Sequence, residues 1–294
     1  MVTVGSILGA TFRFMGDNVR AILVWSSIIF LMSLLTMLIM SPFYAAQVAA
    51  LQGGAAAPPN VGMLFIPIAL SLLVGVVLWA AVFRAVLFPK ESRFAYLRVG
   101  MDELRLLGCV LVLLIAFYLI IAICGIVLGL VVGLLGAAIG GMGAVSATII
   151  ASALGMLILG LWLGTRFSVA GPLTLLERKV IIGPAWRATR GNFWPLLGAY
   201  VVIVLLLMAL YTPVMFARGV SFGTMFNPLG IDTQLEVASA RAAMYTLSLK
   251  NLAISLVISV IGGFALALHA GAIGIAAAQL LNRRGQQQLS EVFE

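Results

Sequence analysis

The chain has 294 residues, of which 63% are hydrophobic and only 9% are charged. Soluble domains carry about 25% charged residues, and runs of about 20 apolar residues are typical of helices that cross a bilayer. The composition therefore excludes an ordinary soluble domain and predicts an all-α, polytopic membrane protein. The net charge of +8 lies in short clusters beside apolar runs, where it suits lipid headgroups, so nucleic acid is not expected as a partner.

The first predicted element is a short amphipathic helix that begins near Val4 and carries apolar residues to Met15. A span follows at 21–40 and is expected to end at Ser41-Pro42, because proline disfavours the continuation of a helix. About twenty apolar residues are more than the core of a signal peptide contains, so we expect this span to be retained.

Five further spans follow in chain order. The second, at 61–88, is stopped by Pro89. The apolar stretch 106–168 is too long for one crossing, so the glycine-rich segment 136–144 is expected to be a turn between the third and fourth spans. The fifth span is expected at 195–216 and the sixth at 251–281.

The segment 217–250 joins the last two spans and is expected to hold a short amphipathic helix. Asp232 is a suitable N-cap for this helix, which would end near Leu249. A helix that lies on the membrane surface is preferred here to a lid or gate over the protein.

The distribution of basic residues predicts the orientation in the bilayer. One side receives most of them: Arg13, Arg20, Lys90, Arg93, Arg98, Arg105, Arg178, Lys179, Arg187, Arg190, Arg283 and Arg284. The other side receives only Arg218, Arg241 and Lys250. Because basic loops stay in the cytoplasm, both termini are predicted to be cytoplasmic.

A small polar pattern occurs three times, each time just before a span. The copies begin at Arg13, Arg98 and Arg187. They predict one membrane domain, 1–294, built of three repeats in the same orientation, each an amphipathic helix plus two spans. The repeats cover about 4–88, 90–168 and 170–281, with a cytoplasmic tail at 282–294. The residues expected to anchor the repeats at the inner leaflet are Arg13, Arg20, Arg98, Asp102, Arg105, Glu177, Arg187, Asn192 and Trp194.

Three ionisable residues are expected near the cytoplasmic ends of the even-numbered spans: Arg84, Arg166 and His269. Ionisable groups within a bilayer are candidates for function. The three could line a polar cavity that binds an anionic ligand or a lipid headgroup. Alternatively, the arginines extend to the headgroups and the histidine is a core residue with its hydrogen bonds satisfied.

Gly125, Gly129 and Gly133 recur every four residues and therefore share one face of a helix. Such a face lets a neighbouring backbone approach closely. Packing against another span of the same chain, with Ala267, Gly271 and Ala278 as a candidate partner face, is preferred to packing in a homo-oligomer.

The segment 166–198 resembles the YciC-like proteins and the membrane-domain family of glycerophosphoryl diester phosphodiesterases. The matching residues are Arg166, Ser168, Pro172, Glu177, Ala185, Arg187, Gly191, Asn192 and Trp194. The resemblance implies a bacterial inner-membrane protein. It does not imply catalysis, because in the namesake the phosphodiesterase activity belongs to a separate soluble domain.

The sequence shows no motif for a catalytic site, and its single histidine does not support an imidazole-rich metal site. We therefore expect a non-enzymatic protein, with no cofactor or metal, that binds or stabilises other membrane proteins or lipid. The alternative function is a transporter or channel for a small anion or lipid that uses Arg84, Arg166 and His269. The lipid bilayer is the expected partner. Other membrane proteins and further copies of the chain are candidate partners.

Overall fold

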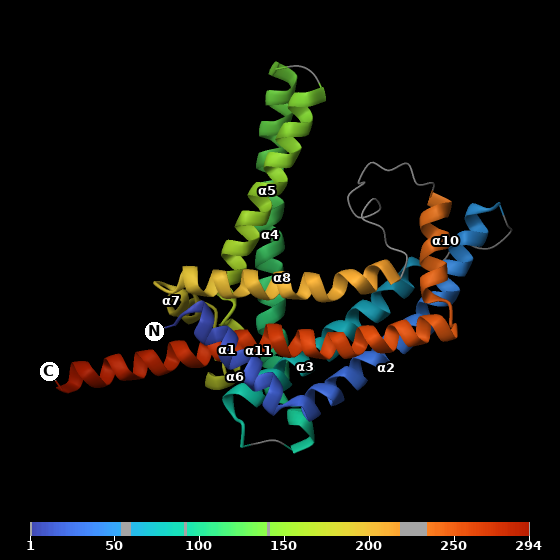
Figure 1. Ribbon diagram of the computed structural model, residues 1–294. Coiled ribbons are helices and arrows are strands. Elements are labelled where there is room, and N and C mark those ends of the chain that lie inside the picture. Colours follow the sequence, from blue (N-terminus) through green and yellow to red (C-terminus); the bar gives the residue numbers. More distant parts are fainter. Residues whose placement is uncertain (1, 54–59, 91–92, 140–141, 218–233, 294) are drawn as a thin grey trace. The chain divides into compact units, whose positions relative to one another are not determined.

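The computed structural model describes residues 2–53, 60–90, 93–139, 142–217 and 234–293 (Figure 1). Within these ranges every regular element is a helix. Six of the described helices are long and apolar enough to cross a membrane. The predicted all-α class and the six spans are therefore confirmed, and the chain is a multi-pass membrane protein.

The six spanning helices are α2 (Val19–Leu51), α3 (Phe65–Leu87), α4 (Met101–Ile139), α5 (Met142–Phe167), α8 (Phe193–Ala217) and α11 (Leu249–Phe293). The shorter elements are α1 (Val4–Asp17), η1 (Val61–Leu64), η2 (Arg93–Tyr96), α6 (Ala170–Glu177), α7 (Gly183–Thr189) and α10 (Gln234–Tyr245).

The boundary between α4 and α5 falls within the glycine-rich segment 136–144, where a turn was predicted, but most of this segment is helical. Helix α4 ends at Ile139 and α5 begins at Met142, and the two helices run side by side (Figure 1). The ring of Phe117 lies 3.6 Å from the position that a Cβ at Gly160 would take. Small residues thus let the two helices of this pair approach each other closely.

Two helices extend beyond their predicted ends. The prediction that the first span ends at Ser41-Pro42 was wrong, because α2 continues through Pro42 to Leu51. A proline inside a helix removes one backbone hydrogen bond, and packing elsewhere along the helix can offset that loss. Helix α11 likewise continues to Phe293, through most of the segment 282–294 that was expected to be a tail.

The extension of α2 has a packing partner in α10, which lies alongside it (Figure 1). The rings of Tyr44 and Tyr245 stack with their centroids 5.1 Å apart. A short helix was expected in this part of the chain, although its predicted N-cap Asp232 lies outside the described residues. Since α2 has 33 residues and is about 50 Å long, it exceeds the roughly 30 Å of a bilayer core.

The chain forms two compact units, which are described separately. Unit 1 comprises Met1–Gly9, Val99–Val201 and Ile273–Glu294. Unit 2 comprises Ala10–Arg98 and Val202–Ala272. Helices α4 to α7 belong to unit 1, whereas α3 and α10 belong to unit 2.

In unit 2, α2 and α11 approach each other most closely at Gly263. A Cβ at this position would clash with Ser26 Oγ and would lie 3.0 Å from the carbonyl oxygen of Ile22. The Ser26 hydroxyl donates a hydrogen bond to that carbonyl at 2.9 Å and also lies 3.5 Å from the carbonyl of Val260. Gly263 therefore allows the backbones of two spans to come into near contact.

In unit 1, the start of α1 is joined to α11. The backbone N–H of Ser6 donates to Thr3 Oγ1 and that of Thr3 donates to Ser6 Oγ, so the two residues cap the helix reciprocally. The amide of Gln279 donates to the Ser6 carbonyl at 3.4 Å. These bonds attach the N-terminal residues to the last span.

The three polar patterns have different local structures. Helix α1 ends at Asp17 just before α2, and α7 ends at Thr189 shortly before α8, with Gly191 at a φ of +84° between them. Before α4, however, the chain forms η2 and not the expected amphipathic helix. Phe94, Ala95 and Tyr96 there have positive φ angles, which L-residues rarely adopt. The threefold repeat therefore stays a prediction.

Candidate functional site

The strongest candidate site lies in unit 1, where α5 ends and the chain turns through α6 and α7 into α8. We call this segment, 166–194, the unit-1 elbow. The Arg166 carbonyl accepts a hydrogen bond from Thr189 Oγ1 at 3.1 Å. The ring of Trp186 lies 5.2 Å from that of Trp162 and 5.3 Å from that of Phe167. Aromatic packing and this hydrogen bond attach α7 to the end of α5.

The guanidinium group of Arg166 is held among aromatic rings. Its Cζ lies 5.3 Å from the centroid of the Trp186 ring and 5.2 Å from that of Phe193. Each such contact attracts the cation, by about 0.5–2 kcal/mol in general. The rings, however, offer no strong acceptor for the N–H groups of arginine.

Two nitrogens of this guanidinium, Nε and Nη1, are buried and have no hydrogen-bond partner among the described residues. Buried polar atoms of native proteins are almost always hydrogen-bonded, because an unpaired one loses its water without compensation. The penalty is larger for a charged group, and arginine stays protonated in proteins. The positive charge of Arg166 is therefore incompletely satisfied by the described residues.

The described carboxylates of unit 1 do not provide a counter-ion. Asp102 pairs with Arg105 of its own helix at 2.8 Å, and Glu103 accepts the backbone N–H of Gly100 at 2.9 Å. Glu177 is exposed. It forms no ion pair among the residues that the structure describes.

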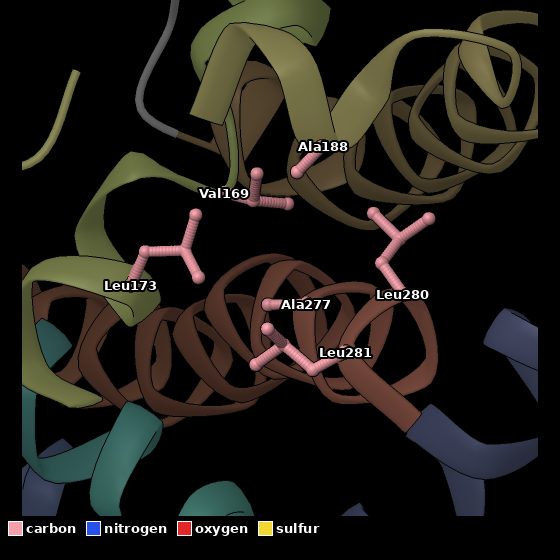
Figure 2. A pocket seen from close by; sticks show the side chains of 6 residues that line it. All are labelled: Val169, Leu173, Ala188, Ala277, Leu280 and Leu281. Atoms are coloured by element: carbon pink, nitrogen blue, oxygen red, sulfur yellow. The ribbon is translucent and has the colours of Figure 1, made fainter. Parts of the chain in front are cut away.

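A small apolar hollow lies near the elbow (Figure 2). It is lined by Val169, Leu173, Ala188, Ala277, Leu280 and Leu281. No water-sized sphere fits inside it. The hollow is thus a narrow gap in the packing, and it is too tight to enclose a ligand.

Arg84 in unit 2 has a different environment from Arg166. It is 5% exposed, and its Nη1 donates to the carbonyl of Tyr96 at 3.3 Å. The indole of Trp25 donates to the neighbouring carbonyl of Ala95 at 3.0 Å. The two side chains hold the left-handed turn of η2, so Arg84 stabilises the loop that follows its own span.

His269, also in unit 2, packs against an aromatic ring. The ring of Trp79 lies 5.5 Å from it in an edge-to-face arrangement. Because Arg166 belongs to unit 1 whereas Arg84 and His269 belong to unit 2, a cavity lined by all three stays a prediction.

The expected interfacial anchors are mostly accessible. Trp194, in the first turn of α8, is 76% exposed. Asn192 is partly buried, and its backbone carbonyl accepts the N–H of Leu196 at the start of this helix. Asp102 and Arg105 are partly exposed, at 33% and 35% of their side chains. Exposed arginines among the predicted anchors are Arg13, Arg20, Arg98 and Arg187.

The predicted glycine face of α4 is used only in part. A Cβ at Gly125 would lie 3.2 Å from the side chain of Met156 on α5, in agreement with packing inside the chain. At Gly129 and Gly133 nothing lies within 4 Å of such a Cβ. The tightest glycine contact of the described residues is at Gly263, which the sequence analysis did not single out although it lies four residues before Ala267 and eight before Gly271.

No group of three or more His, Cys, Asp or Glu residues that could hold a metal ion is found in the described part of the chain. Comparison of the chain with models of protein families, with curated proteins and with solved structures found no match. The resemblance of residues 166–198 to a membrane-domain family therefore stays a prediction.

Proposed function

We propose that this membrane protein is non-catalytic and binds anionic phospholipid headgroups at the cytoplasmic face of a bacterial inner membrane. The observation that carries the proposal is the surface of the unit-1 elbow. Trp194 is 76% exposed there, and Arg187 and Arg190, which precede it closely in the chain, are exposed as well. An indole beside cations is the combination that binds at the level of headgroups.

The packing beneath this surface supports the proposal. Trp186 is fixed between Trp162 and Phe167, and Thr189 bonds to the end of α5. The backbone that carries Arg187 and Arg190 is therefore held in place before any lipid binds. A positioned surface loses less conformational entropy on binding than a flexible loop.

The orientation follows from the charge distribution. The elbow belongs to the side that the positive-inside rule assigns to the cytoplasm, and both termini are proposed to lie on that side. The resemblance of the elbow sequence to bacterial inner-membrane proteins agrees with this assignment. Each basic residue close to an anionic leaflet contributes about 1 kcal/mol of attraction.

The test is lipid enrichment around the full-length protein. The protein is reconstituted in mixed phosphatidylglycerol and phosphatidylcholine, extracted in mild detergent, and its retained lipids are quantified by mass spectrometry. We expect the double variant Arg187→Gln/Arg190→Gln to lower the retained phosphatidylglycerol several-fold, since two charges of about 1 kcal/mol each are removed.

A matched control removes two exposed basic residues from the opposite side. The double variant Arg241→Gln/Lys250→Gln has the same change in charge and should leave the enrichment near the wild-type value. Equal enrichment in the wild type and in both double variants would contradict the proposal. Anion flux into proteoliposomes that disappears with the Arg187/Arg190 pair would indicate a transporter instead.

A further inference from the structure

The unsatisfied guanidinium of Arg166 marks a discrete binding site. We propose that Arg166 binds the phosphate group of an anionic ligand, and that a phospholipid headgroup is the source that the geometry favours. This inference rests on the proposed function and deepens it. The exposed arginines attract the anionic leaflet as a whole, whereas Arg166 binds one phosphate group.

The donor geometry of Arg166 suits an oxyanion. Its enclosed nitrogens Nε and Nη1 have no acceptor in the described part of the chain, and Nη2 is not one of these enclosed atoms. In a guanidinium, Nη2 forms one two-donor fork with Nε and another with Nη1. Either fork matches the spacing of two phosphate oxygens, and such charge-assisted pairs are strong.

The surroundings favour a phosphate from outside the protein. Asp102 and Glu103 are engaged within or before α4, and Glu177 forms no ion pair with the described residues. Trp186 and Phe193 attract the cation but cannot accept its N–H bonds as an oxyanion does. An external anion would satisfy the donors that the described residues leave unpaired.

The position of the site favours a lipid over a small enclosed molecule. Arg166 is the residue before the last in α5, a spanning helix, so it lies near the end of a span, where headgroups are found. The apolar hollow lined by Val169 and Ala188 admits no water-sized sphere. The protein would therefore bind the headgroup alone, while the acyl chains stay in the bilayer.

Native mass spectrometry of the full-length protein in mild detergent tests the site. The probes are phosphatidylglycerol, phosphatidylcholine and inorganic phosphate. We expect the wild type to retain one phosphatidylglycerol under conditions that remove phosphatidylcholine. We expect Arg166→Gln to weaken this binding by about tenfold or more, since it removes charge-assisted hydrogen bonds. The matched control is the exposed Arg241 of the opposite side, and Arg241→Gln should change the one-to-one binding less than about twofold.

The remaining outcomes also decide the proposal. Inorganic phosphate that displaces phosphatidylglycerol from the wild type but not from Arg166→Gln would support the phosphate site and assign it to a free anion. Equal retention by Arg166→Gln and Arg241→Gln would overturn it. If Arg166→Gln does not fold, Arg166→Lys replaces it, because lysine keeps the charge but lacks the fork. Tenfold weaker binding by that variant supports the site, and unchanged binding overturns it.

The two proposals fail in different ways. If the Arg187/Arg190 double variant keeps normal bulk enrichment while Arg166→Gln loses the single bound lipid, the general function is wrong and the site stands. If bulk enrichment falls in the double variant but Arg166→Gln binds as the wild type does, the site is wrong and the general function stands.

Discussion

Replacement of Gly263 by alanine should destabilise unit 2 more than any other single methyl group added to a described glycine. The new Cβ would clash with Ser26 Oγ and lie 3.0 Å from the Ile22 carbonyl oxygen and 3.1 Å from Ser26 Cβ. Two of these three atoms cannot move without a shift of the α2 backbone. Overpacking of this kind costs about 1–3 kcal/mol.

Two further terms act on this variant. The hydrogen bond from Ser26 to Ile22 is weakened, which costs roughly 1 kcal/mol, whereas alanine favours the helix by about 0.5–1 kcal/mol over glycine. The net destabilisation is therefore about 1–3 kcal/mol. It would be measured as the change in the free energy of unfolding, by titration of the detergent-solubilised protein with a denaturing detergent.

A control and a second-site variant make this prediction specific. Gly129→Ala adds the same methyl group at a position where no described neighbour lies within 4 Å of the new Cβ. It should therefore be neutral or stabilising by up to about 1 kcal/mol. Ser26→Ala removes the oxygen of the clash, and combined with Gly263→Ala it should recover part of the loss. The reasoning is refuted if Gly263→Ala unfolds at the same denaturant concentration as Gly129→Ala.

Three further predictions concern the loops and the α2–α10 contact. Trp25→Phe removes the indole donor to the Ala95 carbonyl and should speed tryptic cleavage around η2 several-fold, since the bond contributes about 1 kcal/mol; an unchanged cleavage rate would contradict this. Glu103→Ala should destabilise the start of α4 by about 1 kcal/mol and Glu103→Gln by less, because glutamine can still accept the backbone N–H of Gly100, the residue before the helix; equal hydrogen exchange in the two variants would exclude the cap. Tyr245→Ala should lose the ring stacked on Tyr44 and increase hydrogen exchange in α10 more than Tyr245→Phe does, because phenylalanine keeps the ring. Similar exchange in both Tyr245 variants would show that the stack does not stabilise α10.

The membrane class and the number of spans could be predicted because they depend on local composition. A run of apolar residues long enough to cross a bilayer is visible in the chain itself, whatever its neighbours are. The turn between α4 and α5 followed in the same way from the length of the stretch and its glycines. The end of α2 did not, because the contact of Tyr44 with Tyr245 joins residues that lie far apart in the sequence.

The candidate site was predictable only as a set of residue types. The sequence marked Arg84 and Arg166 alike, as arginines near the ends of two spans. The sequence could not distinguish their environments, because the hydrogen-bond partners of a side chain are residues that the fold brings close to it. Arg84 donates to the Tyr96 carbonyl, whereas Nε and Nη1 of Arg166 meet no acceptor within the ranges that the structure describes.

By itself, the sequence determined that this chain lies in a membrane, crosses it six times and carries its basic residues beside particular spans. Tertiary structure decided which glycine brings two backbones together, which arginine supports a loop and which keeps unpaired donors. The physical reason is that transfer of an apolar segment into lipid depends on the segment alone. Close packing and the pairing of buried polar groups depend on atoms brought together from distant parts of the chain.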